Sequence, residues 1–186
     1  MKILIIGGSK SSKSSYGELF SYRLSKKEKG TLYYIATMNP YDLEDLKRIE
    51  NHLENRKDYD FETVEKHRDL NEIIETFSEN DTVLLDSLTS LVTNEMFNNE
   101  NFNEFIASKI INHIVELGNK VKNMVIVSDY VFSDCIIYDS YTENFRRELG
   151  NITCNLAKNY DVVIEASFGN LIVHKGKEML ESENLI

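Results

Sequence analysis

The sequence predicts an α/β fold built on a mostly parallel sheet with helices on both faces. Short aliphatic runs alternate with segments of helical period along most of the chain, the order expected when each strand is followed by a crossover helix. Four aliphatic residues at 3–6 lead directly into a loop of glycine, serine and lysine, and helical spacing begins at residue 14. This loop therefore lies at the carboxyl end of a buried strand, where such sheets bind ligands.

The remaining segments continue this alternation. After the first strand and a helix at 14–27, further strands are expected at 32–36, 60–65 (a short edge strand), 82–86 and 125–128, with a closing strand pair at 161–166 and 171–174. Further helices are expected at 41–57, 71–78, 104–121 and 142–159. Because 186 residues suffice for one α/β domain with a substantial core and are too few for two of ordinary size, we expect a single domain over 1–186.

Composition narrows the possible partners. The formal net charge is -10 and no stripe of Lys and Arg interleaves with aromatics, so we expect no nucleic-acid partner. The apolar run at 3–6 is too short for a signal-peptide core or a membrane span. Cys135 and Cys154 have no CxxC spacing and no nearby histidine pair. We expect a cytoplasmic protein with reduced cysteines and no membrane insertion.

The loop after the first strand carries the strongest motif. Residues 7–14 match the phosphate-binding pattern G-x-x-x-x-G-K-S/T at every defined position but one. In this pattern, backbone N–H groups and the helix N-terminus point at the phosphates of ATP or GTP, a lysine neutralises their charge, and the last hydroxyl can ligate Mg²⁺. The expected nucleotide-binding residues are Gly7, Gly8, Ser9, Lys10, Ser11, Ser12, Lys13 and Ser14.

Two features of this motif leave room for other interpretations. Ser12 stands where the pattern has glycine, and a side chain there can obstruct a backbone angle or a close approach, so we expect a reduced phosphate affinity. Ser14 suits Mg²⁺ but also suits a plain helix N-cap. Asp86 ends the 82–86 strand as a second Mg²⁺ ligand would, although acids commonly end strands.

The chain resembles the bifunctional adenosylcobinamide kinase and adenosylcobinamide-phosphate guanylyltransferase family of cobalamin biosynthesis. Four segments carry the resemblance: the loop 7–14, Tyr34-Ile35-Ala36-Thr37, Arg48-Ile49-Glu50-Asn51-His52, and residues 84–94, which read LLDSLTSLVTN. The last two are the most specific, and the resemblance runs along nearly the whole chain. It implies a P-loop NTPase with a RecA-like sheet and a homotrimeric assembly.

The resemblance also implies the chemistry. Lys13 and Ser14, with Mg²⁺, would align ATP or GTP for phosphorylation of a cobinamide hydroxyl, and His52 would then take GMP covalently from GTP and pass it to the new phosphate. Lys13 and His52 are thus the expected catalytic residues, and no permanently bound cofactor is expected. The remaining expected nucleotide contacts are Ala36, Thr37, Met38, Arg56 and Glu65, with Glu65 reading guanine. His67, His113 and His174 receive no role.

One segment departs from the family. After the 125–128 strand the family has an Asn-Glu pair and a glycine-containing loop that ends in proline, whereas residues 128–138 lack the glutamate, the glycines and the proline. This loop should face the acceptor substrate, so its change keeps alternatives open. They are a divergent P-loop kinase or nucleotidyltransferase with another substrate, a non-catalytic nucleotide-binding relative, and an interaction protein without ligand.

Overall fold

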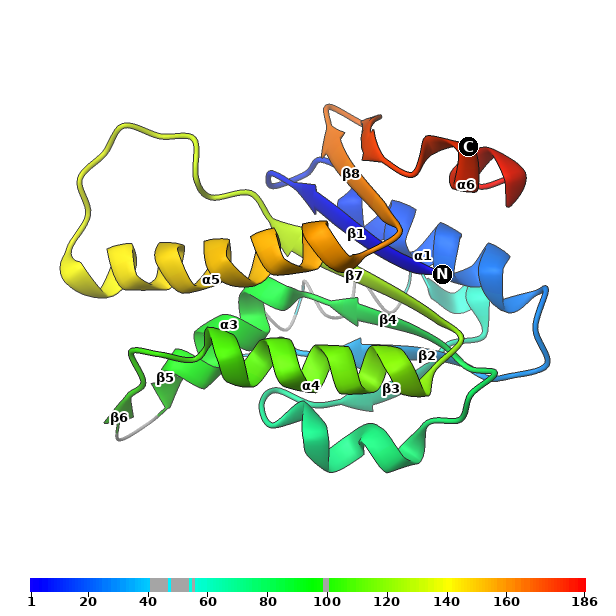
Figure 1. Ribbon diagram of the computed structural model, residues 1–186, viewed down its shortest axis with the longest axis horizontal. Helices are drawn as coiled ribbons and strands as arrows, with labels where there is room; N and C mark the ends of the chain where they lie inside the picture. The colour runs from blue at the N-terminus through cyan, green and yellow to red at the C-terminus, as the bar shows by residue number, and fades with distance from the viewer. Residues whose placement is uncertain (41–46, 48–53, 55, 99–100) are drawn as a thin grey trace.

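The computed structural model describes residues 1–40, 47, 54, 56–98 and 101–186, and centres on a seven-stranded sheet of order β3-β2-β4-β7-β1-β8-β9 (Figure 1). All neighbouring strands pair in parallel except β9, which is antiparallel to β8. The strands are β1 (Lys2–Gly7), β2 (Leu32–Ala36), β3 (Glu62–Glu65), β4 (Thr82–Asp86), β7 (Asn123–Asp129), β8 (Val162–Ser167) and β9 (Asn170–Lys175). The predicted mostly parallel sheet with a C-terminal strand pair is confirmed.

Helices cover both faces of this sheet. One face carries α3 (Leu88–Met96), α4 (Ala107–Lys120), α5 (Ser140–Asn159) and the 3₁₀ helix η2 (Leu70–Thr76), and the other carries α1 (Lys13–Ser25) and α6 (Lys177–Ser182) (Figure 1). A further 3₁₀ turn, η1 (Lys57–Tyr59), precedes β3, and a small hairpin pairs β5 (Phe97–Asn98) with β6 (Asn101–Phe102). No helix in the described part of the chain is long and apolar enough to cross a membrane.

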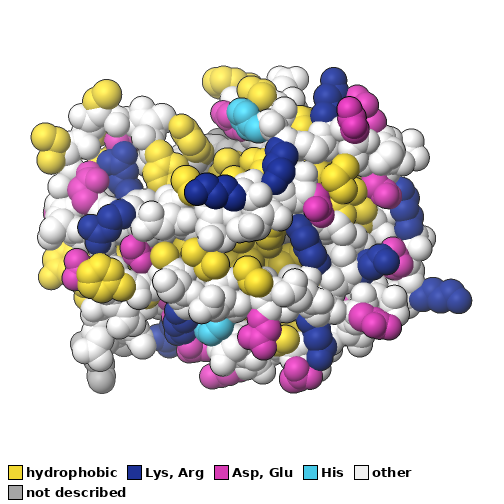
Figure 2. Space-filling view, in the orientation of Figure 1, with side chains coloured by type: hydrophobic (Ala, Val, Ile, Leu, Met, Phe, Trp, Pro, Cys, Tyr) yellow, Lys and Arg dark blue, Asp and Glu magenta, His cyan; other side chains and the backbone are white. Residues whose placement is uncertain are grey.

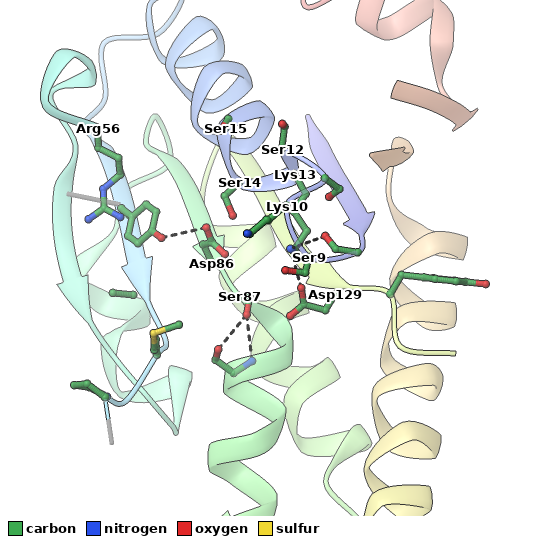
Figure 3. Close-up of a pocket in the computed structure, with 18 of the residues that line it drawn as sticks. Ser9, Lys10, Ser12, Lys13, Ser14, Ser15, Arg56, Asp86, Ser87 and Asp129 are labelled. Carbon is green, nitrogen blue, oxygen red and sulfur yellow. Dashed lines mark hydrogen bonds and ion pairs between the residues drawn. The ribbon is translucent and has the colours of Figure 1, made fainter. Parts of the chain in front are cut away.

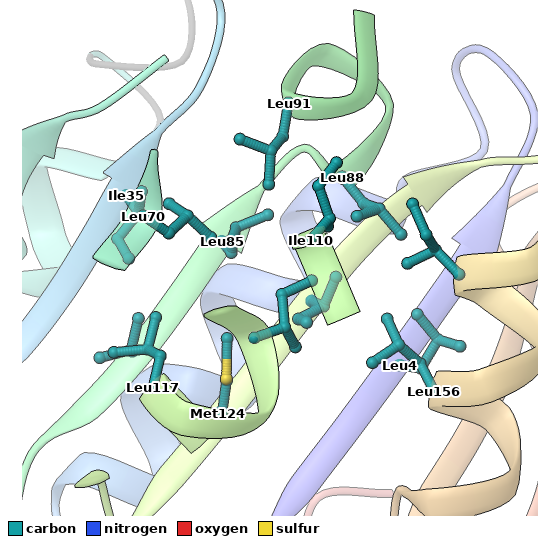
Figure 4. Packing of buried hydrophobic residues seen from close by; sticks show 14 of the residues in the cluster. Leu4, Ile35, Leu70, Leu85, Leu88, Leu91, Ile110, Leu117, Met124 and Leu156 are labelled. Carbon is teal, nitrogen blue, oxygen red and sulfur yellow. The ribbon is translucent and has the colours of Figure 1, made fainter. Parts of the chain in front are cut away.

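The strands read as continuous aliphatic runs because both of their faces are buried. In β4, Val83 and Leu85 pack beneath α3 and α4, whereas Leu84 between them packs on the side of α1. Strand β1 divides in the same way, with Leu4 on one side and Ile3 and Ile5 on the other. Figure 4 shows the larger cluster, in which strand residues meet leucines and isoleucines of the helices. Alternate side chains therefore fill two separate cores.

Several expected elements differ in extent or type. The strands at 32–36 and 82–86 have the predicted bounds, and β3 is the predicted edge strand but begins at Glu62. The helix expected at 71–78 is present as the 3₁₀ helix η2 at Leu70–Thr76, and helices α3 and α6 were not expected. The α3 helix does have a start signal, because the Ser87 side chain accepts a hydrogen bond from the backbone N–H of Ser90. Most of the helix expected at 41–57 lies outside the described residues.

Strand register brings the motif residues to one edge. Gly7 at the end of β1 pairs with Asp129 at the end of β7. Ala36 at the end of β2 pairs with Asp86 of β4 and with Glu65 of β3. Because the strands run in parallel, the loop after β1 and these three acids all lie at the carboxyl edge of the sheet.

Candidate functional site

A cavity of about 950 Å³ opens along this carboxyl edge (Figure 3). The phosphate loop and the start of α1 form one wall, and residues from the ends of β2, β3, β4 and β7 form the others. Of the residues predicted to bind nucleotide, those that line the cavity are Gly8, Ser9, Lys10, Ser11, Ser12, Lys13, Ser14, Ala36, Met38, Arg56, Glu65 and Asp86. Segments far apart in the sequence thus converge on one site.

Two predicted residues support the cavity from behind. At Gly7, an added Cβ would lie 2.5 Å from the carbonyl oxygen of Ala166 in β8, so glycine is required there by close approach. The buried Thr37 hydroxyl donates to the carbonyl of Ser87 at 2.7 Å and accepts from the Ser87 backbone N–H at 2.8 Å. Thr37 therefore ties the end of β2 to the start of α3.

The phosphate loop has a backbone conformation that explains its pattern. Ser12 has φ 70° and ψ 15°, the left-handed region that glycine adopts most readily. In the general pattern, glycine at this position therefore allows the backbone to adopt a positive φ. Helix α1 begins at Lys13, so Ser14 lies inside the helix and is not its N-cap. Ser12 makes no side-chain cap within the described structure, which leaves the first N–H groups of α1 for an anion.

Lys13 is already held by an acid. Its ammonium nitrogen Nζ lies 2.8 Å from Asp129 Oδ1 and 3.3 Å from the carbonyl oxygen of Gly8. The Lys13 side chain is only 13% exposed, so the ammonium is fixed over the loop (Figure 3). Asp129 was not predicted as a site residue, although it ends a core strand as Asp86 does. The argument that singled out Asp86 applies equally to Asp129.

Asp86 and Ser14 are the residues expected to hold Mg²⁺. Both line the cavity, and Asp86 Oδ2 accepts a hydrogen bond from the hydroxyl of Tyr34 at 3.2 Å. A carboxylate and a hydroxyl are oxygen donors of the kind that Mg²⁺ prefers. The described residues form no group of three or more His, Cys, Asp or Glu side chains that could hold a metal. Phosphate oxygens and water would therefore complete the coordination.

A buried polar cluster lies behind Asp86. Glu18, four residues after Ser14 on α1, is 3% exposed, and its Oε1 has no hydrogen-bond partner among the described residues. Burial raises the pKa of Glu18 to about 7, helped by the charge of Asp86 and opposed by Arg56. The guanidinium carbon of Arg56 lies 3.5 Å from the centre of the Tyr34 ring. Arg56 thus lines the cavity while it packs on Tyr34.

The wall on the side of β3 carries a histidine that received no role from the sequence. His67 lines the cavity with Glu65, and its ring Nδ1 lies 3.2 Å from the carbonyl oxygen of Thr37. Since a carbonyl only accepts, Nδ1 donates in this contact. Asn94 also donates to the Thr37 carbonyl, at 2.8 Å. His52, predicted as the nucleophile, lies outside the described residues, as does the segment 48–51 that precedes it.

The surface carries charges of both signs. On the face seen in Figure 2, the Lys and Arg side chains are interspersed with Asp and Glu. With a net charge of -10, the chain carries an overall repulsion for phosphate backbones.

The conformation of Ser12 generates a prediction about stability. A non-glycine residue in the left-handed region costs about 1–2 kcal/mol, and Ser12→Gly should remove this cost. Glycine also gives the unfolded chain more conformational freedom, which offsets part of the gain. The free energy of unfolding should therefore rise by up to about 1 kcal/mol. Ser9→Gly, in the same loop without a positive φ, should lower it by about 0.5–1 kcal/mol. Urea unfolding measures both, and equal destabilisation by the two changes would contradict the assigned conformation.

The buried Glu18 generates a prediction about pH. Since its folded-state pKa is raised from 4.5 to about 7, the folded protein retains a proton that the unfolded chain releases, and stability declines as pH rises from about 4.5 through 7. Glu18→Gln should remove this decline, whereas Glu79→Gln, at an exposed turn, should retain it. Urea unfolding of the nucleotide-free protein between pH 5 and pH 8 tests this. Parallel curves for parent and Glu18→Gln would show that the carboxyl titrates normally.

Comparison with solved structures supports the assigned fold. Flagellar accessory protein FlaH from Methanocaldococcus jannaschii matches with a TM-score of 0.53 and 13% identity, over 94% of this chain and 77% of that one. The ATPase domain of G40P matches with a TM-score of 0.53 and 12% identity, over 88% and 68%. The KaiC-like protein PH0186 from Pyrococcus horikoshii OT3 matches with a TM-score of 0.50 and 12% identity, over 95% and 79%. The predicted P-loop NTPase fold is thereby confirmed.

Sequence comparison addresses the family. A curated relative, the bifunctional adenosylcobalamin biosynthesis protein CobU of Escherichia coli strain K12, is 37% identical over 98 residues. These residues are 52% of this chain, and the match spans only about half, 51%, of that relative. The family model for cobinamide kinase / cobinamide phosphate guanyltransferase matches residues 3–173. From this match over most of its length, the chain belongs to the cobinamide kinase / cobinamide phosphate guanyltransferase family.

Proposed function

We propose that the protein phosphorylates adenosylcobinamide with ATP or GTP and then transfers GMP from GTP to the new phosphate. The observation that carries this proposal is the phosphate loop 7–14 at the edge of a cavity that Asp86 and Glu65 also line. Family membership supplies the substrate class, and the cavity supplies residues suited to both stages. A volume of about 950 Å³ lies at the upper end of the range for ligand sites.

The kinase stage depends on the loop. The N–H groups at the start of α1 would bind the β-phosphate, and the Lys13 ammonium would neutralise charge on the transferred group. Ser14 and Asp86 would hold Mg²⁺, which neutralises charge on the phosphate oxygens when bound. The acceptor hydroxyl then attacks the γ-phosphorus while the bond to the β,γ-bridging oxygen breaks and ADP or GDP leaves.

The second stage depends on His52. A neutral imidazole nitrogen would attack the α-phosphorus of GTP and expel pyrophosphate, and the cobinamide phosphate would then displace the histidine to take GMP. Glu65, at the end of β3, would accept hydrogen bonds from the N1–H and N2–H₂ groups of guanine. Arg56 would contact a nucleotide phosphate from the same wall. The role of His52 rests on the family resemblance alone.

One observation favours a second candidate function. Tyr130 and Val131, in the segment that departs from the family, line the cavity beside the phosphate loop. An altered acceptor wall suits a kinase or nucleotidyltransferase of the same family with a different acceptor. A purified protein that hydrolyses ATP, or transfers its phosphate to another acceptor, but leaves cobinamide unchanged would favour this candidate.

We also propose that the chain assembles as a homotrimer. Light scattering on the purified protein measures the mass of the assembly and tests this proposal.

Lys13→Ala should abolish phosphoryl transfer, with a loss on the order of 10²-fold or more, because it removes the cation that faces the phosphates. Lys29→Ala is the control and should keep the parent rate, because Lys29 is exposed and lies outside the cavity lining. Transfer of labelled phosphate from γ-labelled ATP to adenosylcobinamide measures the effect. Activity retained by Lys13→Ala would contradict the assigned role of Lys13.

The guanylyl stage predicts a covalent adduct. Incubation with Mg²⁺ and α-³²P-labelled GTP should label the parent protein with an acid-labile, alkali-stable bond, and His52→Ala should remain unlabelled. His113→Ala, at a half-buried position of α4 outside the cavity lining, is the control and should label fully. Mass spectrometry of the labelled peptide locates the adduct. A label on His52→Ala, or a GMP adduct mapped to another residue, would remove His52 as the nucleophile.

A further inference from the structure

Asp129 is the carboxylate that touches the phosphate-loop lysine. Its Oδ1 lies 2.8 Å from Lys13 Nζ, and its side chain lines the cavity beside the phosphate loop, within the altered segment 128–138 where the family has its Asn-Glu pair (Figure 3). A lysine in this pattern faces the terminal phosphates when nucleotide is bound. A group in contact with Lys13 therefore lies close to where the transferred phosphate must be.

Hydrogen bonds hold the backbone of Asp129 in place. Asp129 is the last residue of β7 and pairs in register with Gly7, the first residue of the phosphate loop. Its own N–H donates to the hydroxyl of Thr89 in α3 at 2.8 Å, and the next N–H, of Tyr130, donates to the carbonyl of Gly7 at 3.0 Å. These bonds fix Asp129 to α3 and to β1, so it keeps its place when the side chain of Lys13 moves.

Nucleotide binding must change the partner of Lys13. A triphosphate carries several negative charges and outcompetes a single carboxylate for the ammonium group. Once Lys13 turns to the phosphates, Asp129 loses its cation and remains beside the transferred group as an acceptor-only side chain. A free carboxylate at this place can accept a proton from a hydroxyl group that attacks the γ-phosphorus.

The other acids in or near the cavity are placed for different tasks. Asp86 Oδ2 accepts from Tyr34, and Asp86 faces the cavity with Ser14 as a metal ligand would. Glu65 lies at the end of the edge strand β3, three strands away from β7 in the sheet order. Glu18 is buried behind Asp86 and is not among the residues that line the cavity. Within the described residues, Asp129 alone of these acids pairs with the loop lysine.

We propose that Asp129 is the proton acceptor of the kinase stage, paired with Lys13 until a nucleotide binds and then facing the acceptor hydroxyl. This assignment deepens the proposed function and rests on it. As the hydroxyl oxygen forms its bond to the γ-phosphorus, its proton passes to a carboxylate oxygen of Asp129 and the bond from phosphorus to the β,γ-bridging oxygen breaks. ADP leaves with that electron pair, and Asp129 returns its proton to water.

Asp129→Asn separates this role from a structural one, because the change should move binding and transfer in opposite directions. The amide cannot compete for Lys13, so the Kd for ATP should fall about 2- to 5-fold, as expected for a partly exposed ion pair. The amide also cannot take up the proton, so single-turnover transfer to adenosylcobinamide should fall about 10²-fold or more. Asp129→Glu, which keeps a carboxylate, should transfer faster than Asp129→Asn.

Glu75→Gln is the matched control. Glu75 is an exposed acid of η2, outside the cavity lining, and its carboxylate pairs with Lys120 at 2.9 Å. It should leave both the Kd for ATP and the transfer rate within about 2-fold of the parent, the range of an exposed ion pair. Calorimetry gives the Kd, and quenched-flow transfer from γ-labelled ATP gives the rate.

Three results would overturn the proposal. Asp129→Asn could transfer at the parent rate, it could lose affinity and rate together as a damaged fold does, or Glu75→Gln could lose as much as Asp129→Asn. If the proposed function itself is wrong, the result is different: the parent protein binds ATP but does not phosphorylate adenosylcobinamide. The parent measurement therefore separates the acceptor assignment from the role of Asp129.

Discussion

The site depends on the parallel register of four strands. Because β1, β2, β4 and β7 run in parallel, Gly7, Ala36, Asp86 and Asp129 lie at one edge, and the loop that follows β1 shares its cavity with acids from two other strands. The hydrophobic runs that build these strands are buried on both faces, which leaves the strand ends as the place where polar side chains gather. Packing thus determines where the chemistry can occur.

Charge balance across the site follows from this arrangement. The Asp129 carboxylate neutralises the Lys13 ammonium before any phosphate arrives, while Tyr34 and Arg56 line the cavity with Asp86 and Glu18 is buried outside its lining. A phosphate that binds Lys13 therefore replaces the Asp129 carboxylate as its partner, so the ammonium is paired both before and after the nucleotide binds. The strained backbone of Ser12 belongs to the same loop, where a local cost is tolerated because the loop must present its N–H groups.

The sequence predicted the parts of the fold that repeat a simple pattern. Strands 32–36 and 82–86 were correct because two-sided burial produces uninterrupted aliphatic runs with clear ends. Helix α3 was missed because it is short and begins two residues after a strand, so no polar linker marks its start. The loop 7–14 and Asp86 were found from motif and position, whereas the pairing of Lys13 with Asp129 depends on strand order, which periodicity does not reveal. For Ser12 the motif left a special backbone angle and a close approach as alternatives, and the coordinates show the left-handed angle.

A crystal structure with Mg²⁺ and a non-hydrolysable GTP or ATP analogue tests the central claim most directly. The account predicts the phosphates over residues 7–14, with Lys13 Nζ on a phosphate oxygen, the Asp129 carboxylate free of the ammonium, and Ser14 and Asp86 on the metal side. An analogue bound elsewhere in the cavity, with the Lys13 to Asp129 contact intact, would contradict it.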